Sequence, residues 1–388
     1  MKKLGVFSAI ITGVCMAFST IMPISGKFAN AAEEVLTSKS KAAYLCDYHS
    51  GTTIYSSNAD DRLPIASMTK LATLSVIFNN LQQGKLNLQD KITISQNAAD
   101  TEGSSAFLDA GSTYSVADLI KTIVVVSAND SCVALAEHIA GNEQAFADSM
   151  NKLCESLGLT NTHFANSTGL PADNHYSSAR DMAEIYRTVC DNDTYKSYAK
   201  IWMEDFIHPS GRKTGLVNTN RLIKTYQGCD SGKTGHTNEA LYCLTASASR
   251  GGMRLISVVI GAPDSKIRFA EATNMFNYGF ANYTNKEVVS TQAPIAQVSV
   301  KGGQIKSIDC FAAKPYIAFL AKTDDSQFNT RVQLNSNVKA PVAVGDKVGT
   351  LLVLNQNNIV IEEIDLIAGD SVQKIKLGQI LDNIYQNW

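Results

Sequence analysis

The sequence predicts an α/β (α+β) fold, an antiparallel sheet with a helical insertion, followed by a small all-β sandwich. Two short apolar runs separated by turn residues open the chain after its first segment, and a long stretch with helical spacing follows. Three runs with strand character come next. Strands at both ends of a helical stretch favour one layered domain. From about residue 288 the chain consists of short β-branched runs with glycine turns, as in a small sandwich.

Residues 1–31 are expected to be an export signal. Met1-Lys2-Lys3 is basic, residues 4–24 form an apolar run, and Ala29-Asn30-Ala31 offers small residues for cleavage. An uncleaved anchor is the alternative, and Pro23 near the end of the run favours cleavage. We therefore expect an exported protein that works outside the cytoplasm, at the outer face of the membrane or in the cell wall.

The first domain after the signal is expected to cover residues 32–284. Its early hairpin pairs residues 42–47 with residues 52–56. Helices are expected at residues 67–81, 116–125, 131–140, 144–157 and 179–190. The domain is completed by strands at residues 230–235, 241–249 and 254–261 and by a closing helix at residues 266–283.

A second domain, the β-sandwich, is expected at residues 285–370, and an amphipathic helix at residues 371–388. Turn signals at Gly302-Gly303 and Gly345-Asp346 separate the expected strands. Apolar residues of the tail recur at helical spacing, namely Leu377, Ile380, Leu381, Ile384 and Trp388. This helix is too short to span a bilayer, so we expect peripheral contact with a membrane at most.

The composition argues against several classes of function. Removal of the signal takes three lysines from the 34 basic residues and leaves 31 against 36 acidic ones, a formal charge of −5. Such a chain does not attract nucleic acid by bulk charge. The seven remaining cysteines are odd in number and lack CxxC, and no HExxH occurs. We expect no disulfide framework, no metal and no cofactor, and most cysteines buried as small apolar side chains.

Three short patterns could carry chemistry: Ser67-Met68-Thr69-Lys70, Ser127-Ala128-Asn129 and Lys233-Thr234-Gly235. The first has little specificity alone, because SxxK occurs seven times, starting at Ser38, Ser67, Ser149, Ser197, Ser210, Ser336 and Ser371. Only Ser67 stands at the head of an apolar helix, directly after a loop that contains a proline. Context therefore selects Ser67 as the candidate nucleophile.

Ser67 and Lys70 have the spacing of a nucleophile and its base. A helix N-terminus offers unpaired N–H groups to a developing oxyanion, and a lysine one turn on can reach the hydroxyl. As a base, Lys70 needs a pKa about 3 units below roughly 10.4, a cost of about 4 kcal/mol. Burial and a second nearby cation can supply this shift. The alternative, preferred for an isolated SxxK, is a capping serine followed by a solvated lysine.

The second pattern interrupts two predicted helices with a short loop. Ser127 can relay a proton to a leaving amine, and Asn129 can bind an amide carbonyl of a substrate. The alternative is a helix cap, with Asn129 or Asp130 as the N-cap of the following helix. Both roles can hold together.

The third pattern lies on a predicted strand that ends in a turn. An extended peptide can pair along this strand, and Gly235 permits close backbone approach. Lys233 is the second cation, and Thr234 and Thr237 offer hydroxyls to a free carboxylate. The backbone N–H of His236 can complete an oxyanion hole with that of Ser67.

Two further residues near these patterns need an interpretation. Arg268, on the closing helix, is a candidate partner of the same carboxylate, with a surface ion pair as the alternative. A second KTG starts at Lys213, after Pro209-Ser210-Gly211 in a loop-like stretch. We interpret this second KTG as a chance match.

With these motifs in this order, the mature chain resembles the low-molecular-mass penicillin-binding proteins, the serine D-alanyl-D-alanine carboxypeptidases of the S11 type. Residues 157–164, 175–182 and 266–269 extend the resemblance. It implies a serine β-lactamase/DD-peptidase-like fold, a peptidoglycan stem peptide ending in D-Ala-D-Ala as substrate, and β-lactams as covalent inhibitors. By resemblance, the nucleophile is Ser67 and the base Lys70; the rest of the cluster is Ser127, Asn129 and Lys233.

Two other functions are weighed against this one. A class A β-lactamase shares the same residues but turns over penicillin with a glutamate-held water, usually from an ExxLN segment between the second and third motifs. No such segment occurs there, so slow turnover of penicillin is expected. A catalytically silent binding protein is the other alternative, and the intact Ser67, Lys70 and Lys233 argue against it.

Overall fold

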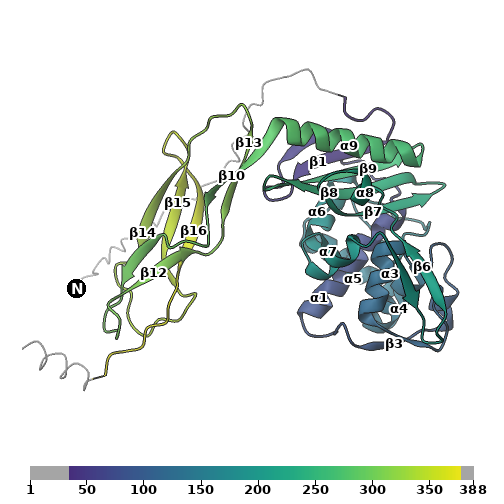
Figure 1. Cartoon of the computed structure of the whole chain (residues 1–388), viewed down its shortest axis with the longest axis horizontal. Helices are drawn as coiled ribbons and strands as arrows, with labels where there is room; N and C mark the ends of the chain where they lie inside the picture. Colours follow the sequence, from purple (N-terminus) through teal and green to yellow (C-terminus); the bar gives the residue numbers. More distant parts are fainter. Residues whose placement is uncertain (1–34, 377–388) are drawn as a thin grey trace, which may run out of the picture. The chain divides into compact units, whose positions relative to one another are not determined.

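A computed structural model describes residues 35–376 of the chain. The predicted signal peptide and most of the predicted terminal helix therefore lie outside the described residues. Within these residues, an α+β part and an all-β part follow one another along the sequence (Figure 1).

A five-stranded antiparallel sheet forms the centre of the α+β part, in the order β2-β1-β9-β8-β7. Its strands are β1 (Ala42–Asp47), β2 (Thr53–Ser57), β7 (Cys229–Thr237), β8 (Leu241–Arg250) and β9 (Met253–Ala262). As the sequence predicted, the early hairpin pairs with the late strands. In the observed register, Tyr44 lies opposite Val258. The two ends of the domain thus meet in one sheet, and β7 is an edge strand.

Both faces of this sheet are covered. Successive residues of β1 point to opposite sides, so Tyr44 and Cys46 join one apolar core while Ala43 and Leu45 join another. Helix α9 (Ser265–Asn282) covers the second core, and the helical insertion covers the first (Figure 1). Every residue of β9 is buried as a result.

The insertion contains helices and two small hairpins. The helices are α1 (Lys70–Gln82), α2 (Gln96–Ala99), α3 (Val116–Val126), α4 (Asn129–Ala140), α5 (Glu143–Ser156), α6 (Ala179–Val189), α7 (Asp193–Ala199) and α8 (Leu222–Thr225). The hairpins pair β3 (Lys91–Thr93) with β4 (Thr113–Ser115) and β5 (Met203–Ile207) with β6 (Lys213–Val217). Residues 70–78 of α1 are all buried, so α1 is a core helix with packing on every side.

Two local predictions are wrong, and a third is met with a difference in detail. The helical segment begins at Ala66, as expected, but its first turn, η1 (Ala66–Thr69), is a 3-10 turn that contains Ser67 and leads into α1. Neither Asn129 nor Asp130 is an N-cap, because Ala128 occupies that position and both residues lie in the first turn of α4. The second KTG, at Lys213, is not in a loop, since it starts β6.

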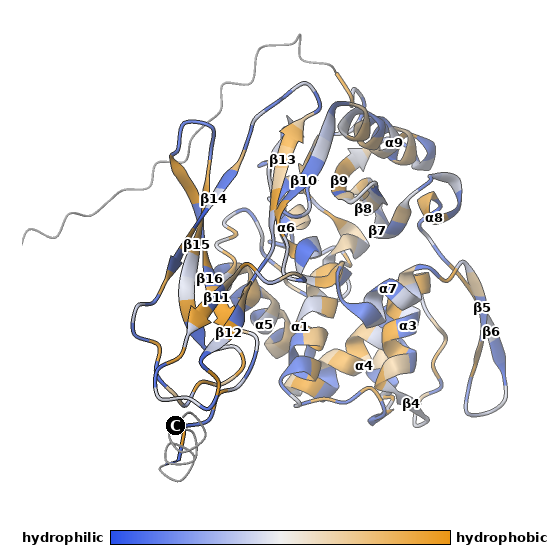
Figure 2. Cartoon of the chain, turned by 60° about the vertical axis from the view of Figure 1, so that its left-hand side comes forward, coloured by the Kyte–Doolittle hydropathy of each residue, from blue (hydrophilic) through white to orange (hydrophobic). Residues whose placement is uncertain are grey.

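The all-β part contains a two-stranded and a five-stranded sheet. Its strands are β10 (Tyr283–Val289), β11 (Ala296–Ser299), β12 (Ser307–Ala312), β13 (Tyr316–Ala321), β14 (Asn329–Leu334), β15 (Lys347–Leu354) and β16 (Val360–Ala368). β10 pairs with β13, and the larger sheet has the order β11-β12-β16-β15-β14. Figure 2 shows the contrast within the smaller sheet, where β13 is hydrophobic and β10 largely hydrophilic.

The start of the predicted terminal helix is extended. Val372 pairs with Val342 and Lys374 with Gly303, so the helix does not begin at residue 371. The remainder, residues 377–388, lies outside the described residues. Between residues 35 and 376, no helix is long and apolar enough to cross a membrane.

Most cysteines of the described chain behave as small apolar side chains. Cys229 is partly exposed, and the buried ones are Cys46, Cys132, Cys154, Cys190, Cys243 and Cys310. The prediction that most are buried is therefore confirmed.

Candidate active site

The candidate nucleophile lies in a tightly bent turn. Ala66, directly before it, has φ +48°, a left-handed conformation that is unfavourable for alanine. Ala66, Met68 and Thr69 of η1 are buried, whereas Ser67 is half-buried. The turn therefore fixes Ser67 from both sides and leaves its side chain within reach of a ligand.

Lys70 reaches this hydroxyl as the spacing predicted. Its Nζ donates to Ser67 Oγ at 2.8 Å and to the carbonyl oxygen of Thr168 at 2.6 Å. The Lys70 side chain is fully buried, and burial lowers its pKa to about 8. A substantial fraction of neutral amine is then present near neutral pH, which a base for Ser67 requires.

Ser127 and Lys233 form a second pair of the same kind. Ser127 ends α3 in a left-handed conformation, φ +66°, which turns it out of the helix. Lys233 Nζ donates to Ser127 Oγ and to the Thr234 carbonyl oxygen, each at 2.8 Å. Burial, and then the charge of Lys70, hold the pKa of Lys233 well below its usual value. The expected lowering of the Lys70 pKa by a second cation is not seen: burial lowers the pKa of Lys70, and the charge of Lys70 in turn lowers the pKa of Lys233.

Asn129 is fixed by a loop that the sequence analysis did not assign. Its backbone N–H donates to Ser104 O at 2.7 Å, and its Nδ2 donates to Glu102 O at 2.6 Å. The Asn129 Oδ1 is buried without a partner in the described structure. A buried amide oxygen of this kind is costly unless a ligand satisfies it, so Asn129 has an acceptor available for an amide N–H. This differs from the expectation that Asn129 binds an amide carbonyl, because the Nδ2 group that such a contact needs donates to Glu102 O.

Asp130 holds the same loop in place. The carboxylate of Asp130 is fully buried and accepts hydrogen bonds from Ser105 Oγ and from the backbone N–H groups of Ala106 and Leu108. Its role is structural, and it joins the loop to the start of α4.

The third motif lies on the edge strand β7, against the turn that carries Ser67. A Cβ added to Gly235 would lie 2.5 Å from Ile65 O, so only glycine permits this approach of the two segments. Thr234 Oγ1 donates to Thr219 Oγ1 at 2.8 Å, and Thr237 Oγ1 accepts from the Ala240 N–H at 3.0 Å. The side chain of His236 is exposed and packs on the Tyr242 ring, with centroids 4.2 Å apart.

Arg268 approaches β7 from the closing helix. The surface ion pair considered for it is wrong: the side chain is buried, and none of the described carboxylates forms a salt bridge with it. Arg268 Nη1 donates to Gly235 O at 3.0 Å and to Cys243 O at 3.2 Å, and its Nε is buried without a partner. Burial lowers its pKa to about 10, so the guanidinium remains a cation next to β7.

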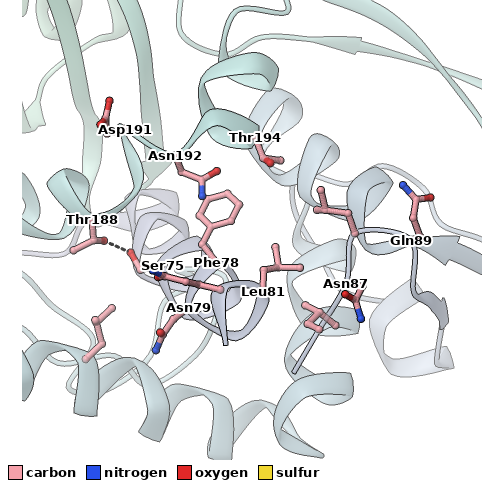
Figure 3. Close-up of a pocket in the computed structure, with 14 residues that line it drawn as sticks. Ser75, Phe78, Asn79, Leu81, Asn87, Gln89, Thr188, Asp191, Asn192 and Thr194 are labelled. Atoms are coloured by element: carbon pink, nitrogen blue, oxygen red, sulfur yellow. Dashed lines mark hydrogen bonds between the residues drawn. The ribbon is translucent and has the colours of Figure 1, made fainter. Parts of the chain in front are cut away.

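A large cavity within the described residues does not coincide with the predicted site residues. A cavity of about 910 Å³ lies beside the C-terminal half of α1, where Ser75 and Thr188 are joined by a hydrogen bond (Figure 3). None of the predicted site residues lines this cavity. A smaller hollow, by contrast, is lined by Ala66, Gly169 and Thr237, next to the nucleophile.

The structure therefore brings the predicted residues together from η1, α1, the α3–α4 break and β7. Two serine hydroxyls each bound by a buried lysine, beside a free sheet edge, can carry out acyl transfer on an extended peptide. Sequence reasoning missed the contributions of Thr168, Glu102 and Thr219. All three act within irregular segments, where no periodicity marks them. Thr168 alone had a signal, because the segments on either side of it, residues 157–164 and 175–182, extended the family resemblance.

Comparison with family models gives two matches in succession. Residues 28–264 match the S11 peptidase model, described as D-alanyl-D-alanine carboxypeptidase. Residues 283–374 match the C-terminal domain of penicillin-binding protein 5. The two matches follow the order of the α+β and all-β parts.

Individual relatives cover nearly the whole chain. It is 37% identical over 354 residues to the D-alanyl-D-alanine carboxypeptidase DacF of Bacillus subtilis, covering 91% of each chain. It is 33% identical over 380 residues to DacC of Escherichia coli, covering 95% of this chain and 93% of that one. Penicillin-binding protein 5 from Haemophilus influenzae has a similar solved structure, with a TM-score of 0.67 and 34% identity over 87% of this chain and 98% of that one.

Proposed function

The chain belongs to the S11 family of serine-type D-alanyl-D-alanine carboxypeptidases, which act on peptidoglycan, and from that premise we propose that Ser67 forms its acyl-enzyme. The observation that carries this proposal is the 2.8 Å hydrogen bond between Lys70 Nζ and Ser67 Oγ, with Lys70 fully buried. Among the SxxK serines, Ser67 is the one with this environment.

In the acylation step, neutral Lys70 takes the proton of Ser67 as Oγ attacks the carbonyl carbon between the two D-alanines. The developing oxyanion accepts hydrogen bonds from the backbone N–H groups of Ser67 and His236. The amide C–N bond then breaks. Ser127, held by Lys233, passes a proton to the departing amine and takes up the proton that Lys70 received from Ser67, so Lys70 is neutral again when free D-alanine leaves.

In the deacylation step, a water molecule attacks the ester carbon of the acyl-enzyme. Lys70 accepts a proton from this water, and Ser67 Oγ recovers a proton as the ester bond breaks. The shortened peptide leaves with a new carboxylate. Each cycle consumes one water and one peptide bond, and Ser67 and Lys70 return to their starting states.

Substrate binding is assigned to the edge strand β7 and the amide of Asn129. The peptide lies extended along the free edge of β7, and its amide N–H groups can reach Asn129 Oδ1. The hydroxyls of Thr234 and Thr237, with the nearby Arg268 cation, favour the terminal carboxylate. Gly235 keeps this strand close to Ser67.

Penicillin binding, which the family implies, follows from the same chemistry. Opening of a β-lactam ring leaves the amine tethered to the acyl group, so no leaving group departs and the ester persists. Lys70 is held by Ser67 and by the Thr168 carbonyl, and the interval between the second and third motifs lacks an ExxLN glutamate. These features support a penicillin-inhibited carboxypeptidase over a class A β-lactamase.

The proposed processing and location follow from the sequence. We assign residues 1–31 to a cleaved export signal, residues 32–284 to the peptidase domain and residues 285–370 to the β-domain. The family acts on peptidoglycan, which lies outside the cytoplasm, and this supports a place at the outer face of the membrane or in the wall. Peripheral membrane contact is assigned to the tail beyond residue 376.

The deciding experiment measures D-alanine released from a peptide ending in D-Ala-D-Ala. Wild type and Ser210→Ala, which changes an exposed serine of another SxxK, should release D-alanine equally. Ser67→Ala should release none. Undiminished release by Ser67→Ala would refute the nucleophile.

Mass spectrometry after penicillin treatment separates the alternatives. A long-lived adduct on Ser67 is the expected result. Brief labelling followed by rapid loss would instead indicate a β-lactamase. The absence of both adduct and D-alanine release would indicate a silent binding protein.

A further inference from the structure

The turn before the nucleophile needs an external support. A left-handed conformation is strained for alanine, so the surroundings must hold Ala66 in this conformation. Gly169 lies against it, and a Cβ at Gly169 would be only 2.1 Å from Ala66 O. Glycine there makes room for the turn but does not hold it. The turn is held by a hydrogen bond of 2.8 Å that Thr69 Oγ1 donates to Ala66 O.

His175 fixes the direction of that hydrogen bond. Its Nδ1 accepts from the Ala165 N–H at 3.2 Å, so the ring proton is on Nε2. Nε2 lies 2.7 Å from Thr69 Oγ1 and donates to it. Thr69 therefore has its lone pair engaged by His175 and directs its own proton to Ala66 O.

The ring is held rigidly in this role. His175 is only 9% exposed, and it packs edge-to-face on Phe164 with centroids 5.7 Å apart. It comes from the loop that also supplies Thr168 O to Lys70, so the same loop supports both ends of the Ser67–Lys70 pair. None of these contacts reaches Ser67 directly.

We propose that His175 is a positioning residue for the reaction: through Thr69 it holds the turn at Ala66 and thereby sets the direction of Ser67 Oγ. This inference rests on Ser67 being the nucleophile. His175 exchanges no proton with the substrate. Its contribution is to the acylation step and not to the binding of the peptide.

The neutral ring required for this role agrees with its surroundings. Burial, followed by the charges of His163 and Lys70, lowers the pKa of His175 to about 4. The carboxylates of Asp173 and Glu239, which line the adjoining hollow, are exposed to solvent. A charged ring would place two N–H donors, those of Nδ1 and Ala165, against each other.

The test compares variants that keep or remove the Nε2–H donor. His175→Phe preserves the ring and removes both nitrogens, His175→Gln keeps a donor of similar reach, and Thr69→Val removes the hydroxyl at equal volume. His163→Phe is the matched control, because it lies on the same loop but outside this chain of hydrogen bonds. For each, we would measure the penicillin acylation rate, kcat and KM for D-alanine release, and the melting temperature.

His175→Phe should acylate about tenfold more slowly than wild type, with KM within about twofold, since one oriented hydrogen bond is lost. His175→Gln should retain the rate within about threefold, and His163→Phe should match wild type. The Thr69→Val/His175→Phe double variant should be no slower than Thr69→Val alone, because both changes break one chain.

The proposal would be overturned if folded His175→Phe acylated at the wild-type rate. It would also be overturned if the rate loss of the double variant equalled the product of the rate losses of Thr69→Val and His175→Phe. If His175→Phe does not fold, the comparison of His175→Gln with Thr69→Val decides: equal losses in both also overturn it. A failure of the proposed function is distinct, because wild type itself would then form no adduct at Ser67.

Discussion

Raising the pH from 7 to 9 should increase the rate of penicillin acylation about tenfold, because Lys70 acts as a base only in its neutral form. With a pKa of about 8, its neutral fraction is about 9% at pH 7, about 50% at pH 8 and about 91% at pH 9. An unperturbed lysine with a pKa of 10.5 would be about 0.03% neutral at pH 7. Burial therefore supplies about 300-fold more base at neutral pH, at a cost of about 3 kcal/mol.

The sign follows from the direction of the shift. The pKa of Lys70 is lowered on folding, so the native protein releases this proton on passing upward through about pH 8, and acylation rises in the same window. The assay is the rate of adduct formation from pH 6 to 9.5, followed by mass spectrometry. Lys70→Arg is the decisive variant, because a guanidinium stays protonated throughout this range.

Lys70→Arg should acylate at least about 1,000-fold more slowly and lose the rise with pH. An acylation rate in wild type that stays flat between pH 7 and 9 would refute the reasoning. So would an unchanged pH profile in Lys70→Arg, since the titrating group would then be another residue.

Two of three further predictions use matched pairs within the chain. Gly235→Ala should reduce the acylation rate at least about tenfold, because its Cβ would meet Ile65 O. Gly215→Ala, in the second KTG with open space around it, should acylate within about twofold of wild type. Equal effects of the two changes would contradict the packing argument. Lys233→Met should slow acylation about 100-fold, because the contact with Ser127 is lost. Lys213→Met changes an exposed lysine of β6 and should leave the acylation rate unchanged. A fully active Lys233→Met would exclude the Ser127 contact from the mechanism. Asp130→Ala should lower the free energy of unfolding, measured in urea, by about 2–4 kcal/mol, because four donors lose a buried acceptor. An unchanged denaturation midpoint would show that the loop is held otherwise.

Regular elements of the α+β part could be predicted from the sequence, because their signals are local. The helices α3, α5 and α6 and the strands β7, β8 and β9 have apolar periods long enough to read, and their ends agree within one or two residues. The short hairpins and α2, α7 and α8 were not predicted. In β6, Lys213 follows polar turn residues, and only pairing with β5 makes the segment a strand.

The individual residues of the catalytic cluster were also predictable, since their types and spacings identify the chemistry. Ser67 and Lys70 lie one turn apart, and that spacing alone places the amine near the hydroxyl. The contact of Lys233 with Ser127 joins positions 106 residues apart, and the family resemblance was needed to expect it. The break between α3 and α4 shows the limit of prediction from sequence. Ser127 ends α3 in a left-handed conformation that no local preference of serine predicts, and this makes Ala128, and not Asn129 or Asp130, the N-cap of α4.

By itself, the sequence determined the α+β class and the all-β domain that follows, and it selected Ser67 as the proposed nucleophile, because these depend on periodicity and on residue type. Only the tertiary structure decided how basic Lys70 is, which atom of Asn129 is free and what supports the turn at Ala66. Burial, hydrogen-bond direction and close approach arise between segments far apart along the chain. The loop that supplies Thr168 and His175 has no periodic signal of its own, and its function exists only where it packs against η1 and α1.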